Sequence, residues 1–199
     1  MPRVTIFDYG AGNLHSLAKA LAAPGVELRY RADPLASLDT DVLVLPGVGN
    51  FSAAAARIGE ARDAMRTAIQ RGLPTLGVCL GMQLLFDASD EGAGPGLGVI
   101  AGRVTALRAS RIPQIGWNAI EEARDSLFAS SSLSVAYYAN GFACRPSDAS
   151  AVMAWTTHEA DRFPAAIRIG RTLGVQFHPE KSSTAGVRFV RAFLEEATA

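Results

Sequence analysis

Short apolar runs alternate with stretches of helical spacing through the first half of the chain. The apolar runs are β-branched or leucine-rich, as is typical of strands buried on both faces of a parallel sheet: RVTIF (3–7), DVLVLP (41–46) and LPTLGV (73–78). Between them lie two helical patterns that close on glycine, a common helix stop: HSLAKALAAPG (15–25) and AAAARIGEARDAMRTAIQRG (53–72). The pattern predicts the order βαβαβα, with helices on both faces of a mostly parallel central sheet.

The pattern changes after Gly92, within the glycine-rich segment EGAGPGLGVIAG (91–102). Short runs suited to antiparallel strands follow: GRVTAL (102–107), SVAYYA (134–139), AVMAW (151–155), AAIRI (165–169) and LGVQF (173–177). The last run, TAGVRFVRAFLEEA (184–197), predicts a helix with one apolar face made of Val187, Val190, Phe193 and Leu194. Because no repeat or linker divides the chain, we expect a single α/β domain over residues 1–199, with an antiparallel extension in its second half.

Composition narrows the classes of function. The 199 residues are 49% apolar and carry 19 basic and 19 acidic side chains, so no net charge attracts nucleic acid or an anionic membrane. The chain does not open on a basic segment followed by an apolar one, and it lacks an apolar stretch of about 18 or more residues. We therefore expect a cytoplasmic protein without a nucleic-acid or membrane partner. With only Cys79 and Cys144, a disulfide framework is not expected.

Cys79 stands between two glycines where a predicted strand meets a predicted helix. The segment GVCLG (77–81) has the form G-x-nucleophile-x-G, in which small neighbours permit a sharp, strained turn that exposes the middle side chain. Backbone N–H groups at the start of the next helix, beginning with that of Leu80, would favour the thiolate and stabilise an oxyanion. A lone cysteine more often fills space in a core, which is what we expect of Cys144. The nucleophile hypothesis for Cys79 therefore requires a base.

His178 has the most informative setting of the three histidines, GVQFHPEKSS (174–183). Pro179 favours an extended conformation at His178, and residues two apart in an extended chain face the same way, so Glu180 can orient the imidazole. Cys79, His178 and Glu180 are therefore a candidate nucleophile, base and orienting carboxylate. Neither His15 nor His158 stands in a comparable sequence pattern, and we expect both to be surface or helix-packing residues. Neither C-x-x-C nor H-E-x-x-H occurs. No metal site and no cofactor are expected.

Five motifs give the chain a family resemblance. With the turn LPGVGNF (45–51), the cysteine corner and the HPE segment resemble the class I glutamine amidotransferases. The order and spacing are those of the glutaminase subunits of imidazole glycerol phosphate synthase, a histidine-biosynthesis enzyme: DYGAGNLHSL (8–17), PGVGNF (46–51), GVCLGMQLLF (77–86), PQIGWN (113–118) and QFHPEKSS (176–183). The glutaminases for anthranilate, carbamoyl phosphate or pyridoxal phosphate synthesis do not share the DYGxGN and PQxGWN segments.

The resemblance implies glutamine as the substrate and a role for each matching residue. Cys79 would attack the side-chain amide carbon, His178 would protonate the departing ammonia, and Glu180 would hold the imidazole, after which water cleaves the thioester. Residues implied in the oxyanion hole or the substrate pocket are Gly47, Val48, Gly49, Leu80, Gln83, Gly141 and Phe142. Many members have His-Ser or His-Thr where this chain has Asn140-Gly141, a change that contacts through backbone amides can tolerate.

The resemblance also implies a partner, a (β/α)₈-barrel cyclase that takes the ammonia and closes the imidazole ring. The phosphorylated substrate would belong to the barrel, in keeping with the absence here of G-x-x-x-x-G-K-[ST]. We expect a heterodimer in which the cyclase covers the face carrying Asn13, Trp117 and Lys181, near the carboxyl ends of the strands. Lys181 is one of only two lysines in the chain, and Trp117 suits an interface anchor.

Two alternatives remain on the residues alone. The segment VTIFDYGAGNLHSL (4–17) runs strand, glycine turn, helix, like a dinucleotide-binding fingerprint, but His15 stands where G-x-G-x-x-G requires its last glycine. A Cys-His hydrolase of a related peptidase-like superfamily would use the same cysteine corner. It would cleave peptide bonds, whereas a glutaminase would be labelled at Cys79 by a reactive glutamine analogue.

Overall fold

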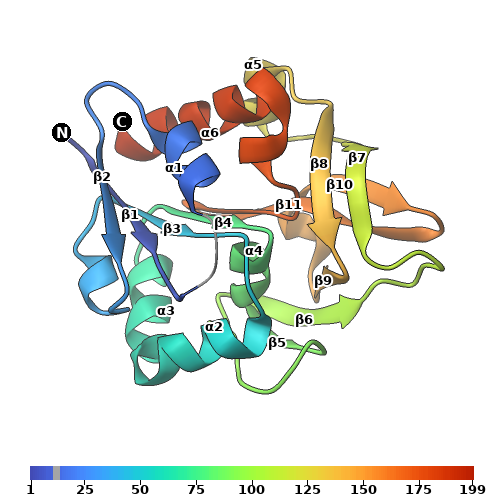
Figure 1. Cartoon of the computed structure of the whole chain (residues 1–199), viewed down its shortest axis with the longest axis horizontal. Helices are drawn as coiled ribbons and strands as arrows, with labels where there is room; N and C mark the ends of the chain where they lie inside the picture. Colours follow the sequence, from blue (N-terminus) through green and yellow to red (C-terminus); the bar gives the residue numbers. More distant parts are fainter. Residues whose placement is uncertain (11–13) are drawn as a thin grey trace.

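A seven-stranded sheet forms the centre of the protein, in the strand order β10-β11-β12-β4-β3-β1-β2 (Figure 1). The computed structural model describes residues 1–10 and 14–199. Five strands pair in parallel: β1 (Arg3–Phe7), β2 (Glu27–Arg31), β3 (Val42–Leu45), β4 (Thr75–Val78) and β12 (Thr172–Val175). Two antiparallel strands, β10 (Val152–His158) and β11 (Asp161–Ile169), extend the sheet beyond β12. The predicted mostly parallel sheet is confirmed.

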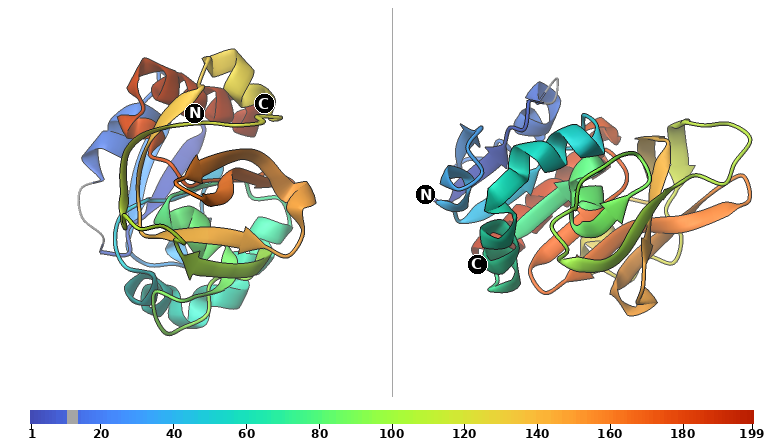
Figure 2. Two further views of the ribbon diagram at one scale, coloured as in Figure 1. Left: turned by 90° about the vertical axis from the view of Figure 1, so that its right-hand side faces the viewer. Right: turned by 90° about the horizontal axis from the view of Figure 1, so that it is seen from below.

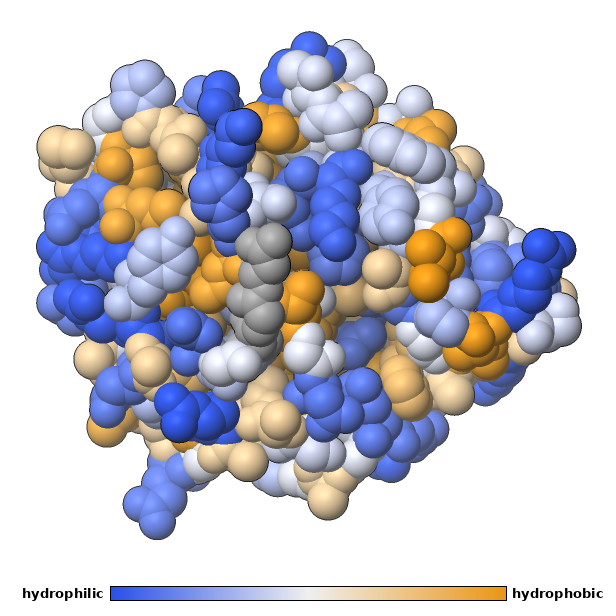
Figure 3. Space-filling model, in the orientation of Figure 1, coloured by the Kyte–Doolittle hydropathy of each residue, from blue (hydrophilic) through white to orange (hydrophobic). Residues whose placement is uncertain are grey.

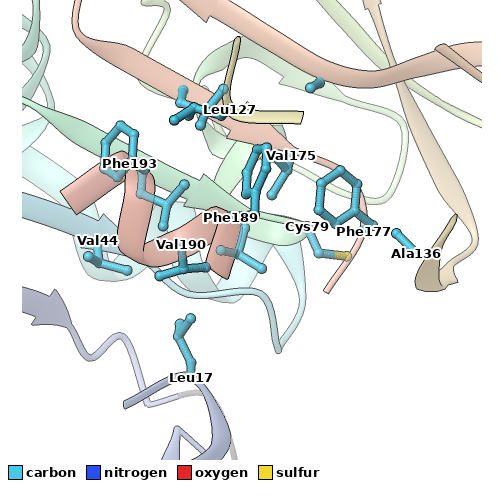
Figure 4. Packing of buried hydrophobic residues seen from close by; sticks show 14 of the residues in the cluster. Leu17, Val44, Cys79, Leu127, Ala136, Val175, Phe177, Phe189, Val190 and Phe193 are labelled. Atoms are coloured by element: carbon cyan, nitrogen blue, oxygen red, sulfur yellow. The ribbon is translucent and has the colours of Figure 1, made fainter. Parts of the chain in front are cut away.

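Helices cover both faces of the parallel strands (Figures 1 and 2). On one face lie α1 (His15–Leu21) and α6 (Ser183–Thr198), with α5 (Ser126–Ser131) beside α6. On the other lie α2 (Phe51–Ile58) and α3 (Arg62–Gln70). Strand β3 shows why its apolar run is continuous, because Val42 and Val44 belong to one buried cluster while Leu43 and Leu45 belong to the other. Figure 4 shows the first cluster, with Val44 near Val190 of α6 and Cys79 beside Phe177.

The second half of the chain adds two small sheets beside the central one. One joins β5 (Phe86–Ser89), β6 (Ile100–Ala106) and β9 (Phe142–Pro146), and the other pairs β7 (Gln114–Ala119) with β8 (Val135–Asn140). Short 3₁₀ helices complete the order: η1 (Ala36–Leu38), η2 (Gly59–Ala61), η3 (Ala149–Ala151) and η4 (Pro179–Lys181). Within residues 1–10 and 14–199, no helix has the length and apolar character needed to cross a membrane.

Several boundaries differ from the predicted pattern. The stretch 53–72 holds two helices because Gly59, with φ of +48°, breaks the spiral between α2 and α3. The helix predicted over 15–25 ends at Leu21, since Pro24 disfavours helical backbone at Ala23. Strand β2 was missed because it is a polar edge strand, and β12 pairs in parallel with β4 instead of belonging wholly to the antiparallel extension.

The two helices nearest the candidate site also differ from expectation. The helix after Cys79, α4 (Leu80–Leu84), has only five residues before the chain enters β5. In α6, Val187 is only partly buried, whereas Phe189 is fully buried and joins the apolar face. The cluster beneath α6 draws its aromatic contacts from Phe128, Phe177 and Phe189, which come from three separate segments.

Candidate active site

Cys79 occupies a strained corner between β4 and α4. Its backbone has φ of 46° and ψ of −102°, in the region that favours glycine, and such a residue costs about 1–3 kcal/mol. A Cβ atom at Gly81 would lie 2.0 Å from the carbonyl oxygen of Leu45, and one at Gly77 would lie 2.8 Å from the Gly81 backbone. The two glycines are therefore needed because three backbone segments meet at this corner. The Cys79 N–H donates to the Val175 carbonyl over 2.7 Å, which holds the corner against β12.

His178 and Glu180 follow β12, the strand next to β4. The Nδ1 atom of His178 lies 2.8 Å from Oε1 of Glu180, with side chains 3% and 7% exposed. The carboxylate can only accept, so Nδ1 donates to it and Nε2 is left to face the thiol. His178 is extended, as predicted, but Glu180 reaches the ring because η4 turns the chain back.

The charge state of His178 follows from its two partners. Burial by itself would lower the pKa of His178, because it penalises the imidazolium. Hydrogen bonds to Cys79 and Glu180, together with their negative charges, outweigh burial and raise the pKa of His178 from 6.5 to about 10. The imidazolium is therefore the stable form at neutral pH, and it can serve as a proton donor.

A cavity of about 250 Å³ opens over the thiol and brings most of the predicted site residues together. It is lined by Gly47, Val48, Gly49, Cys79, Leu80, Gln83, Glu91, Ala139, Asn140, Gly141, Phe142, His178 and Lys181. Cys79, His178, Lys181 and all seven residues expected in the oxyanion hole or substrate pocket are in this set. Glu180 contacts His178 but does not line the cavity, Trp117 does not line it either, and Asn13 is outside the described residues.

The turn after β3 lines the same cavity as the thiol. A Cβ atom at Gly47 would lie 3.0 Å from Cε1 of His178 and 2.9 Å from Cγ1 of Val78, so only glycine fits between the ring and β4. The Tyr9 hydroxyl, from the DYG motif, donates to the Pro46 carbonyl and ties β1 to this turn. Burial, with the nearby Cys79 and Asp8, raises the pKa of Tyr9 well above its ordinary value, so the hydroxyl remains a donor.

Sequence reasoning missed three polar residues at this site. Glu91 reaches the cavity from the glycine-rich loop, where its Oε2 accepts from the Phe51 N–H over 2.9 Å. Asn140, considered only as a departure from the family pattern, donates from Nδ2 to the Phe142 carbonyl over 3.0 Å. Gln176 stood inside a quoted motif without a role, and its amide lies 3.4 Å from the Cys79 sulfur. Only Gln176 had a sequence signal, since it lies within the strand predicted over 173–177 and stands two residues before His178.

Trp117 and Lys181 both lie against Tyr137. The Trp117 side chain is 56% exposed and packs edge-on against Tyr137, with ring centroids 6.1 Å apart. The Lys181 Nζ atom lies 5.8 Å from the centroid of the same Tyr137 ring. On the side of the molecule formed by β7 and β8, Figure 3 shows exposed apolar side chains among polar ones. Tyr137 therefore links the two residues that the sequence placed on one docking face.

Comparisons with known proteins agree with this fold and site. Residues 5–197 match the family model for glutamine amidotransferase class-I. A relative from Symbiobacterium thermophilum is 43% identical, covering 96% of this chain and 92% of the relative. Relatives from Synechococcus sp. (strain JA-3-3Ab) and Gloeobacter violaceus are 40% and 37% identical, covering 97% and 98% of this chain and 93% and 90% of the relatives. All three are named imidazole glycerol phosphate synthase subunit HisH.

Solved structures give the same fold at lower sequence identity. A structure titled as a glutamine amidotransferase superposes with a TM-score of 0.76 at 21% identity, covering 98% of this chain and 99% of that one. PurLQS from Thermotoga maritima matches with a TM-score of 0.76 at 20% identity, covering 98% of each chain. The chain belongs to the class I glutamine amidotransferases. Within that class, it belongs to the family of imidazole glycerol phosphate synthase subunits HisH.

Proposed function

We propose that this chain hydrolyses glutamine to glutamate and ammonia and supplies the ammonia to a (β/α)₈-barrel cyclase that forms imidazole glycerol phosphate in histidine biosynthesis. The observation that carries the proposal is the convergence of a strained cysteine and a histidine–glutamate pair on one cavity. A nucleophile, a base and an orienting group in this order are what acyl transfer from an amide requires. The HisH relatives narrow the proposal to this synthase.

The proposed reaction begins with the thiolate of Cys79 attacking the side-chain amide carbon of glutamine. The C–S bond forms while the carbonyl electrons move to oxygen, where the N–H groups of Leu80 and of the Gly47–Gly49 turn would stabilise the oxyanion. Leu80 is the first residue of α4, so its N–H has no partner within the helix. Collapse of the oxyanion breaks the C–N bond, and the imidazolium of His178 protonates the departing nitrogen.

The second half of the reaction returns the enzyme to its starting state. Neutral His178 removes a proton from water, and the oxygen attacks the thioester carbon. Collapse of this second oxyanion expels the thiolate and releases glutamate. Glu180 holds Nδ1 throughout, so the same ring nitrogen exchanges protons in both halves.

Charges around the cavity suit a free amino acid. We infer that Glu91 faces the α-ammonium group of glutamine and that backbone N–H groups of Gly141 and Phe142 bind its α-carboxylate. The carbonyl of Phe142 accepts from both Asn140 and Gln83, over 3.0 and 3.3 Å, which holds this segment in place. The contact from Asn140 shows how its side chain can support the segment without the histidine that many members have there.

The partner proposal rests on the face where Trp117, Tyr137 and Lys181 meet. We infer that the cyclase covers this face, because Lys181 lines the cavity as well, and ammonia leaving Cys79 would then pass under the partner without reaching bulk water. Buried, unpaired Cys79 and Cys144 are compatible with a reducing compartment, in agreement with a cytoplasmic location.

The test is ammonia release from glutamine, measured with and without the cyclase. Cys79→Ala should abolish glutamine hydrolysis and leave the cyclase able to use added ammonia, because only the nucleophile is lost. His178→Ala should be similarly severe, since members of such a set act as a unit. Cys144→Ala is the matched control, a second buried cysteine that does not line the cavity. Glutamine hydrolysis by Cys79→Ala above a trace would remove Cys79 from the proposed role.

A further inference from the structure

Gln176 touches the sulfur atom of the candidate nucleophile without lining the cavity. It directly follows β12, its backbone N–H donates to the Ala165 carbonyl over 2.9 Å, and the residue is fully buried. Its Nε2 atom lies 3.4 Å from Sγ of Cys79. An amide NH₂ group can donate but cannot accept, so the sulfur is the acceptor in this contact.

The neighbours of Gln176 decide which way its amide points. Nε2 of Gln83 donates to the Phe142 carbonyl over 3.3 Å, and the same atom lies 3.4 Å from Oε1 of Gln176. Because Gln83 presents donors to both neighbours, Gln176 must present its oxygen to Gln83. The Gln176 NH₂ group is then directed at Cys79. Two buried glutamines thus form a fixed chain of hydrogen bonds that ends on the sulfur.

The surroundings of Cys79 make a neutral donor useful. Cys79 is 5% exposed and belongs to the apolar cluster, where it lies beside Phe177 (Figure 4), and the imidazolium of His178 is the charged group that faces its sulfur. Helix α4 has only five residues, so its dipole interacts with a thiolate less strongly than that of a long helix would. A hydrogen bond from a neutral amide stabilises the charged form of the sulfur without adding another charge.

We propose that Gln176 belongs to the catalytic machinery, where its amide donates a hydrogen bond to the Cys79 thiolate and keeps the sulfur ionised and in place before glutamine binds. The inference rests on the proposed role of Cys79 as the nucleophile. It assigns to Gln83 a second task besides lining the pocket, which is to orient Gln176. No proton passes through either glutamine.

The test measures how the rate of Cys79 alkylation by iodoacetamide depends on pH, with the modified peptide identified by mass spectrometry. In Gln176→Met, a side chain of similar length that cannot donate, the midpoint of this profile should rise by about one pH unit. The more basic thiolate is the better nucleophile, so the rate below both midpoints should fall only about threefold, and the rate above them should not fall. The kcat for glutamine should drop more than KM rises, because Gln176 does not line the cavity.

Gln114→Met is the matched control, since Gln114 is a buried glutamine of β7 that does not line the cavity. Its midpoint should equal that of the wild-type chain. Gln83→Met keeps Gln176 but removes the group that orients it, and it should raise the midpoint in the same direction by a smaller amount. This third variant decides the matter if Gln176→Met lacks a native circular dichroism spectrum.

An unchanged midpoint in folded Gln176→Met would overturn the inference, and so would a lower rate at every pH with no change of midpoint. If Gln176→Met does not fold, an unchanged midpoint in Gln83→Met overturns it. If the wild-type chain hydrolyses glutamine but the midpoint is the same in Gln176→Met, the result supports the proposed function and refutes only the role of Gln176. If the wild-type chain shows no glutaminase activity even with the cyclase, but the midpoint rises in Gln176→Met, the result supports the contact of Gln176 with the thiolate and refutes the proposed function.

Discussion

Replacing Glu180 by glutamine tests how the site sets the charge of His178. The change keeps the size of the side chain but replaces an ionised oxygen, 2.8 Å from Nδ1 of His178, with a neutral amide. Hydrogen bonds to charged groups contribute about 1.5–3 kcal/mol, which corresponds to about one to two pH units in the pKa of the imidazole. The pKa of His178 should therefore fall from about 10 by that amount.

The same range of free energy sets the expected loss of activity in Glu180→Gln. An interaction of about 1.5–3 kcal/mol, if lost from the transition state, lowers kcat/KM by roughly 10- to 10²-fold. This is milder than the loss expected for Cys79→Ala, because the nucleophile and the imidazole both remain. The glutamine side chain can still accept a hydrogen bond from the ring through its carbonyl oxygen, so the orientation of the imidazole is largely kept.

The free energy of unfolding should depend on pH, and the raised pKa of His178 determines the direction of that dependence. The folded-state pKa of His178, about 10, lies above its ordinary value of 6.5, so the folded protein binds more protons between these values. The contribution of His178 to the free energy of unfolding is therefore full below pH 6.5 and is lost as the pH rises towards 10. In Glu180→Gln both the contribution and its pH dependence should shrink, because the two pKa values lie closer together.

The assays are ammonia release from glutamine in the presence of the cyclase and denaturant unfolding at several pH values between 6 and 10. Glu159→Gln is the control, a carboxylate that accepts hydrogen bonds from Ser110 and Arg111 but does not line the cavity. It should leave kcat/KM unchanged. Wild-type activity in Glu180→Gln, with the same dependence of unfolding on pH, would refute the reasoning that Glu180 stabilises the imidazolium.

Three further predictions concern the partner and the corner. The isolated chain should hydrolyse glutamine slowly, because the peptide at Val48, between two glycines, is free to turn its N–H away from the oxyanion. One lost donor lowers the rate on the order of 10²- to 10³-fold. Equal turnover with and without the cyclase would contradict this. Lys181→Ala should weaken both complex affinity and glutamine-dependent cyclase turnover, and no change in either would place the docking face elsewhere. Gly81→Ala should lower Tm by about 2–12 °C through overpacking against Leu45, as calorimetry can measure, whereas Gly141→Ala, with no contact below 3.5 Å, should not.

Local patterns were enough to establish the central elements. Strands β1, β3 and β4 were predictable because a strand buried on both faces is apolar at most of its positions, and β3 consists only of valine and leucine. The cysteine corner was predictable because Gly77 and Gly81 stand where neighbouring backbone leaves no room for a Cβ atom, and this requirement appears in the sequence as the two glycines around Cys79. The His178–Glu180 contact was predictable because the two residues are neighbours in sequence, so no long-range information was needed.

Tertiary structure decided which distant segments complete the site. Glu91 comes from a glycine-rich loop with no periodic pattern, and only the packing of that loop against the start of α2 brings its carboxylate to the cavity. The break at Gly59 was hidden because glycine is compatible with more than one backbone path until packing selects one, whereas the end of α1 at Leu21 has a local cause in Pro24.

Gln176 shows most clearly which properties follow from the sequence and which depend on the tertiary structure. Its place in the strand predicted over 173–177 could be inferred from the sequence, but its contact with Cys79 joins residues 97 positions apart and requires β12 to lie beside β4. The orientation of its amide depends in turn on Gln83, which belongs to helix α4. A sequence shows which residues can donate a hydrogen bond, whereas only the pairing of strands and the packing of helices determine which acceptor receives it.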